Sequence, residues 1–96
     1  MREKEFQQRV VEEAHVAGWM TYHTYDSRRS TPGFPDLVMV RADRLIFAEL
    51  KVRGKPRPEQ DIWLDALRET GAEVYLWYPK DTEEILAILD SAYTSE

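Results

Sequence analysis

The sequence contains no cysteine. Disulfide bonds, zinc sites built on thiolates and cysteine nucleophiles are therefore excluded, and the composition fits a reducing compartment. The chain also lacks an apolar run long enough to cross a bilayer, and the charged segment 1–9 is not a secretory signal. We therefore expect a cytoplasmic protein that has no membrane partner.

An excess of basic residues, which is typical of nucleic-acid-binding proteins, is also missing, because the formal net charge is -5 at pH 7. The distribution of charge is more informative than its sum. Segment 51–57 carries lysine and arginine but no acid, and a second basic site lies in the polar stretch 26–33. Both segments could contact phosphates or simply be solvated loops. The candidate DNA-binding residues are Arg28, Arg29, Ser30, Arg53, Lys55 and Arg57.

The 96 residues are expected to form one domain, 1–96, around a single core. Apolar spacing predicts helices over 3–17, from Pro58 to about Gly71, and after Asp81, where a D-x-x-E pattern favours a capping box. Runs rich in β-branched and aromatic residues predict strands at 19–25, 36–41, 45–52 and 73–78. This α-β-β-β-α-β-α order predicts an α/β fold, in which the helical crossover makes an antiparallel meander into a mixed sheet.

The segment 45–52 is the most informative strand. Side chains alternate along a strand, so Leu45, Phe47, Glu49 and Lys51 share one face. Both faces are largely apolar, which predicts a central, buried strand. A carboxylate on such a strand requires compensation for its lost hydration.

The hairpin register suggests how Glu49 is compensated. A turn centred on Ala42 and Asp43 sets Asp36 directly opposite Glu49, with Cβ atoms about 4.5 to 5.5 Å apart. Two facing carboxylates repel unless one is protonated or a cation lies between them, and Mg²⁺ prefers carboxylate oxygens with water. A bulge or an odd-length loop would instead place them on different faces.

Lys51 lies on the same face as Glu49, where its ammonium group can orient a water nucleophile and counter charge on a phosphorane. The alternative is that Asp36 caps a turn and Glu49 pairs with Lys51 as a structural ion pair. Glu3, with Glu5 as its alternative, could add an acid from the first helix, or be an ordinary exposed residue. Gln60 points inward and needs a hydrogen-bond partner, for structural or functional reasons.

Pro35-Asp36 and Glu49-Leu50-Lys51 fit the PD-(D/E)XK nuclease signature, and a wider set of residues resembles the VRR-NUC nucleases of that superfamily. The resemblance extends from residue 3 to about residue 90. It rests on Glu3, Phe6 and Gln7, on Gly18-Trp19, on Asp26-Ser27-Arg28, on Gly33-Phe34-Pro35-Asp36-Leu37-Val38, on Phe47-Ala48-Glu49-Leu50-Lys51 and on Pro58-Glu59-Gln60.

The resemblance implies a restriction-endonuclease-like fold and a DNA endonuclease that uses Mg²⁺ or Mn²⁺. Small stand-alone, viral-type members of the family are similar to homodimeric Holliday junction resolvases, which implies branched DNA as the substrate. The resemblance also implies roles for individual residues. Asp36, Glu49 and the carbonyl of Leu50 would hold metal, Lys51 would be catalytic, Glu3 would be the acid of the first helix, and Gln60 would support the site.

Other functions remain open at this point. The same site could serve a flap, nicking or restriction-type nuclease. A DNA-binding module that has lost activity, and an acidic protein that recruits partners, are the non-enzymatic alternatives.

Overall fold

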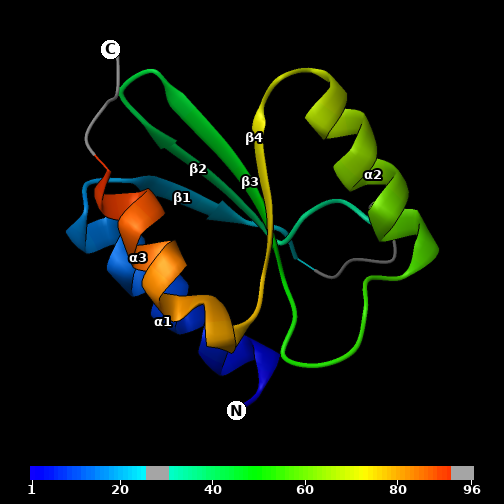
Figure 1. Cartoon of the computed structure of the whole chain (residues 1–96), viewed down its shortest axis with the longest axis horizontal. Coiled ribbons are helices and arrows are strands. Elements are labelled where there is room, and N and C mark those ends of the chain that lie inside the picture. Colours follow the sequence, from blue (N-terminus) through cyan, green and yellow to red (C-terminus); the bar gives the residue numbers. More distant parts are fainter. Residues whose placement is uncertain (26–30, 92–96) are drawn as a thin grey trace.

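The computed structural model describes residues 1–25 and 31–91. Four strands and three α-helices follow one another in the predicted order, with a short 3-10 turn, Pro79–Asp81, before the last helix (Figure 1). The elements are α1 (Glu3–Val16), β1 (Met20–His23), β2 (Leu37–Arg41), β3 (Arg44–Leu50), α2 (Pro58–Glu69), β4 (Glu73–Trp77) and α3 (Thr82–Asp90).

The strands form one mixed sheet in the order β1-β2-β3-β4. The first three strands are antiparallel to their neighbours, and β4 lies parallel to β3. Helices α1 and α3 lie on one side of the sheet and α2 on the other (Figure 1). The predicted α/β fold with a mixed central sheet is confirmed.

The main core lies between the sheet and the pair α1 and α3. Leu37, Met39, Ile46 and Ala48 are fully buried there, because alternate residues of β2 and β3 face these helices. Full burial of the larger side chains, Leu37, Met39 and Ile46, contributes about 1.5–3 kcal/mol each. Helix α1 contributes residues spaced four apart to the same core, namely Phe6, Val10 and Ala14.

The hairpin between β2 and β3 has the predicted register. Leu37 pairs with Ala48, and Arg41 pairs with Arg44 across the turn. Ala42 adopts a φ of 55°, which suits a two-residue hairpin turn that follows the twist of the strands. The even-length turn keeps alternate residues of both strands on common faces, and no bulge interrupts the pairs between β2 and β3.

The start of α3 differs from the prediction. Asp81 makes no side-chain cap to α3. Its Oδ2 instead accepts a hydrogen bond of 2.9 Å from the Tyr78 N–H, within the 3-10 turn that precedes the helix. The expected D-x-x-E capping box is therefore wrong, because Pro79 begins a separate turn whose backbone uses the Asp81 carboxylate.

Segment 1–25 and segment 31–91 contain no helix that is both long enough and apolar enough to span a membrane.

Candidate active site

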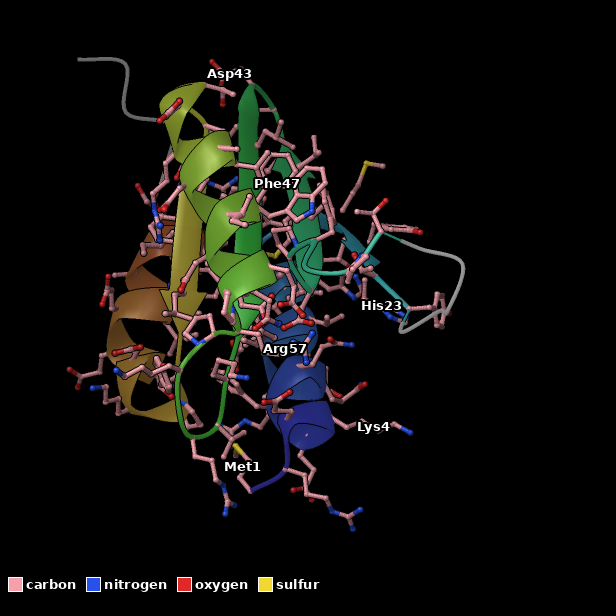
Figure 2. The ribbon with its side chains drawn as sticks, turned by 90° about the vertical axis from the view of Figure 1, so that its right-hand side faces the viewer. Met1, Lys4, His23, Asp43, Phe47 and Arg57 are labelled. Carbon is pink, nitrogen blue, oxygen red and sulfur yellow. The ribbon has the colours of Figure 1, made fainter. Side chains whose placement is uncertain are left out.

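The two acidic residues of the hairpin lie at the end of the sheet remote from the β2–β3 turn. Asp36 immediately precedes β2, and the register continues to place it opposite Glu49 near the end of β3. One Asp36 carboxylate oxygen, Oδ2, accepts a hydrogen bond of 2.9 Å from the Leu50 N–H. Figure 2 shows Asp43 at the top of the sheet, Phe47 below it and Arg57 further toward this end.

Glu49 is a buried carboxylate with an unusual proton affinity. It is only 2% exposed. Burial, followed by the negative charge of Asp36, raises the pKa of Glu49 to about 8. Burial also raises the pKa of Asp36, whereas the hydrogen bond from Leu50 lowers it. The two carboxylates are therefore electrostatically coupled, and a cation between them would favour the ionised form of both.

Gln60 connects the first turn of α2 to this carboxylate pair. Its Nε2 donates a hydrogen bond of 2.7 Å to Glu49 Oε2. Its Oε1 accepts a hydrogen bond of 2.7 Å from the Arg57 N–H, so this backbone donor at the N-terminus of α2 has a partner. Gln60 therefore has the hydrogen-bond partners that its inward position requires, one of them structural and one in the candidate site.

Lys51 and Glu3 approach the same end of the sheet from β3 and α1. The Lys51 Nζ lies 4.0 Å from Glu3 Oε2, and the Lys51 side chain is 15% exposed. Glu3, rather than its alternative Glu5, faces the candidate site. Glu5 accepts a hydrogen bond of 2.9 Å from the Arg2 N–H at the start of α1.

These side chains surround one cavity of about 310 Å³. Asp36, Glu49, Lys51, Glu3 and Gln60 all line it, so the structure brings together every predicted catalytic side chain. The sequence analysis missed several other lining residues, because their place depends on how the loop before β2 packs across the sheet. These residues are Thr24, Tyr25, Thr31, Pro32, Gly33 and Phe34.

The predicted DNA-contacting residues lie at different distances from the cavity. Arg57 lines the cavity, while Arg53 and Lys55 are exposed on the loop between β3 and α2. The hydroxyl of Tyr78 donates a hydrogen bond of 2.6 Å to the Gly54 carbonyl and so attaches this loop to the end of β4. Arg28, Arg29 and Ser30 lie outside the described residues. The metal role of the Leu50 carbonyl stays a prediction.

A divalent cation fits the chemistry of this pair. The described segments hold no group of three or more His, Cys, Asp or Glu side chains arranged for a metal. Mg²⁺ needs fewer protein ligands, because one or two carboxylates with water and substrate phosphate complete its shell. Glu49 Oε1 is buried and has no hydrogen-bond partner among the described residues. Such an orphaned oxygen beside a second carboxylate is the donor set that a hard cation prefers.

The VRR-NUC domain model matches residues 2–80, which include the helices α1 and α2 and the strands β2 and β3 that build this site. The chain belongs to the VRR-NUC family. Among curated proteins, none matches the chain significantly. A solved structure, Hjc of Archaeoglobus fulgidus, described as a Holliday junction resolvase from an archaeal hyperthermophile, shares the fold with a TM-score of 0.60. It is 21% identical, and the match covers 80% of this chain and 69% of Hjc.

Family membership makes the chain a nuclease of the PD-(D/E)XK type, with the fold that the sequence predicts. The divalent metal is a general property of such nucleases.

The pKa of Glu49 leads to a prediction for stability in metal-free buffer. The folded chain holds a proton on Glu49 up to about pH 8, whereas the unfolded chain releases it near the ordinary value of 4.5. Stability from this group is therefore complete below about pH 4.5 and is lost as the pH rises to about 8. Glu49→Gln removes this loss, so the variant should be more stable than wild type at pH 8 but not at pH 4.5.

Urea unfolding in EDTA at several pH values measures this difference. One pKa unit corresponds to about 1.4 kcal/mol, so we expect the advantage of Glu49→Gln to grow by at least about that amount between the two ends of the range. Glu69→Gln, at an exposed position of α2, is the matched control and should show no such trend. A stability difference between Glu49→Gln and wild type that is independent of pH would contradict the assignment.

Proposed function

We propose that this chain is a divalent-metal-dependent DNA endonuclease that acts on branched DNA. The observation that carries the proposal is the buried Glu49 carboxylate, which has an orphaned oxygen and faces Asp36 across the hairpin. Burying Glu49 on a central strand opposite the half-buried Asp36 costs stability, as the raised pKa of Glu49 indicates. Such a cost is understandable where the pair holds Mg²⁺ or Mn²⁺ for catalysis.

In this proposal each side chain has a separate task. Asp36 and Glu49, with the Leu50 carbonyl, hold the ion, which supplies Lewis acidity at the phosphodiester. Lys51 positions the attacking water and counters the charge that develops on the phosphorane. Gln60 holds the Glu49 carboxylate in place through its hydrogen bond to Oε2. Glu3 lies close enough to Lys51 to influence the position of its ammonium group.

The basic residues around the cavity would bind the DNA backbone. Arg57 lines the cavity, and Arg53 and Lys55 extend from the adjacent exposed loop, where phosphates can reach them. Arg28, Arg29 and Ser30 are proposed to contact the backbone from the other loop. Because the net charge of the chain is -5, these local basic residues must outweigh its overall repulsion of DNA.

Branched DNA is the proposed substrate class. Two observations support it: membership of the VRR-NUC family and the fold shared with a protein that is described as a Holliday junction resolvase. One protein preparation should be incubated with a four-way junction, a flap and a linear duplex of matched sequence, in Mg²⁺, Mn²⁺ and EDTA. We expect cutting of the junction in either metal, slower cutting of the linear duplex, and no cutting in EDTA.

The result of this assay distinguishes the alternatives. Preferential cutting of the flap or of linear duplex would replace junction resolution with flap, nicking or restriction-type cleavage. Tight binding of DNA without cutting in either metal would indicate an inactive DNA-binding module. Equal activity in EDTA would refute the metal-dependent mechanism.

A two-fold dimer is the proposed active assembly, because two subunits can cut two symmetric strands of a junction. An exposed apolar row crosses the sheet on the face that carries Glu49. Met20 pairs with Val40, and Val40 pairs with Leu45, so the three side chains point to the same side. They are 74%, 39% and 42% exposed, which is unusual for adjacent large apolar side chains on a sheet. This row suits a second copy of the chain.

Sedimentation velocity measures the assembly directly. We expect a species of twice the 11.3 kDa chain mass at micromolar protein, and the Val40→Glu variant should shift it toward monomer. Ala66→Glu, at an exposed position of α2, introduces the same charge change elsewhere and should leave the dimer intact. A wild-type chain that is monomeric at these concentrations would refute the dimer.

A further inference from the structure

An exposed aromatic ring lies at the mouth of the cavity and has no role in the chemistry described so far. Tyr25 is 67% exposed, yet it lines the same cavity as Asp36, Glu49 and Lys51. A large ring in contact with water gains little from hydrophobic burial. Its position beside a candidate nuclease site therefore calls for a functional explanation.

The backbone that carries Tyr25 is attached directly to the segment that carries Asp36. The Thr24 N–H donates a hydrogen bond of 2.8 Å to the Asp36 carbonyl. The Thr24 hydroxyl donates a second, also of 2.8 Å, to the Pro35 carbonyl. The Tyr25 ring itself packs against His23, with ring centroids 4.4 Å apart and a tilt of 57°. The two hydrogen bonds thus fix the backbone next to Tyr25 relative to Asp36, and the His23 contact orients the ring.

A second aromatic residue forms part of the same wall. Phe34 lines the cavity, and its ring is fixed by edge contacts with Phe47 and Trp63, at centroid distances of 6.0 and 5.1 Å. Cationic groups lie elsewhere around the cavity, on Lys51 and Arg57. The lining therefore combines aromatic rings with cations and an acidic pair. Aromatic faces bind bases, while cations bind phosphates.

The volume of the cavity limits what it can receive. At about 310 Å³ it lies at the small end of the range of about 300–1,000 Å³ that is usual for small-molecule sites. A base pair with its backbone is too large for this space. A single nucleotide, turned out of its stack, is of the appropriate size.

We propose that the cavity receives one unstacked nucleotide beside the scissile phosphate, and that the Tyr25 ring stacks on its base. This inference rests on the proposed nuclease function and adds a basis for substrate choice. Extracting a base from a regular duplex costs a few kcal/mol of pairing and stacking, and the cost is lowest where the base is already unpaired. A branch point offers such nucleotides, so the cavity would select branched over linear DNA without reading sequence.

The test is a double-mutant cycle between protein and DNA. Wild type and Tyr25→Ala are each measured on a branched DNA with all bases present and on copies with an abasic site at successive positions around the branch. Binding is measured by fluorescence anisotropy with Ca²⁺ in place of Mg²⁺, and cleavage is measured in Mg²⁺. Tyr25→Phe retains the ring, and Tyr25→Leu retains apolar bulk without an aromatic face. The midpoint of thermal unfolding shows that each variant is folded.

Tyr25→Ala and Tyr25→Leu should each lose about 5- to 150-fold in affinity or kcat/KM on intact branched DNA, corresponding to the roughly 1–3 kcal/mol of one stacked base. Tyr25→Phe should behave like wild type. When the base at one particular position is removed, the affinity of the wild type should fall by a similar factor. The affinity of Tyr25→Ala should fall little on that abasic DNA compared with intact DNA. An equal effect of Tyr25→Ala on intact DNA and on every abasic DNA would refute stacking.

The two proposals fail in different ways. If the Tyr25→Ala variant cleaves branched DNA as fast as wild type, the proposed nucleotide site is refuted and the proposed nuclease function stands. If the binding assay shows coupling between Tyr25 and one base but the wild type does not cleave DNA, the nuclease function is refuted and the nucleotide site is supported. A chain that binds no branched DNA would overturn both.

Discussion

Replacing Lys51 with alanine is expected to lower kcat for metal-dependent DNA cleavage by about 10²- to 10⁴-fold, the range typical of losing a charged or proton-transferring catalytic group. The Lys51 side chain is 15% exposed and lies at the cavity beside Glu49, so no other described lysine can take its place. Its removal also leaves the acidic pair and Glu3 without a neighbouring ammonium group. The chemical step should therefore suffer more than DNA binding.

Single-turnover cleavage and DNA binding, measured separately, test this division. Lys55→Ala is the matched control, because it removes a lysine from the exposed loop that follows β3. It should weaken binding, more so at low salt, and change the single-turnover rate little. If Lys51→Ala cleaves saturating DNA as fast as Lys55→Ala does, the assignment of Lys51 to catalysis is wrong.

Replacing Gly33 with alanine should give the largest loss of stability. Gly33 has a φ of +100°, and an added Cβ would lie 2.5 Å from the Glu59 carbonyl oxygen and 3.0 Å from Trp63 Cδ1. The nearest obstacle is the backbone of α2, which cannot move without shifting the helix that carries Gln60. The strained φ costs about 1–2 kcal/mol and the steric overlap about 1–3 kcal/mol more, giving about 2–5 kcal/mol in total.

Gly71→Ala isolates the backbone part of this effect. Gly71 has a similar φ of +87°, but an added Cβ there meets no described atom within 4 Å. The Gly71→Ala variant should therefore lose only the stability that the strained φ costs. For a domain of this size 1 kcal/mol corresponds to about 4–8 °C in Tm, so the two variants should differ by at least about that amount. Equal losses at both positions would show that the loop before β2 is not packed tightly on α2.

Gly33→Ala should also impair the site. Gly33 and Phe34 line the cavity two or three residues before Asp36, so a displaced loop would move the carboxylate. DNA cleavage should fall even at a temperature where the variant is folded, whereas Gly71→Ala should keep its activity.

Much of the site follows from local rules. The alternation of side chains on β3 and a two-residue turn at Ala42 and Asp43 suffice to place Asp36 opposite Glu49. These rules operate between strands that are adjacent in the chain, so the sequence contains both partners and the connection. Gly18 and Gly71 were read as helix ends for a similarly local reason, and both have positive φ in the structure.

Contacts between distant segments could not be read in this way. Gln60 was recognised as an inward polar residue, but its simultaneous bonds to Glu49 and Arg57 depend on how α2 packs against the sheet. Tyr25 belongs to the cavity because Thr24 is bonded to the segment before β2. The choice between Glu3 and Glu5 depends on the rotation of α1 over the end of β3. The failed cap at Asp81 shows the same limit, because a local motif was used by a different turn.

The most direct test of the central claim is calorimetric titration of the DNA-free protein with Mn²⁺ at pH 7, in two buffers of different ionisation enthalpy. The account predicts that wild type binds Mn²⁺ and releases a proton as Glu49 ionises, since burial and Asp36 hold its pKa at about 8 in the free chain. The Asp36→Asn and Glu49→Gln variants should lose this binding. Mn²⁺ binding that is unchanged in both variants, or absent from the wild type, would contradict the account.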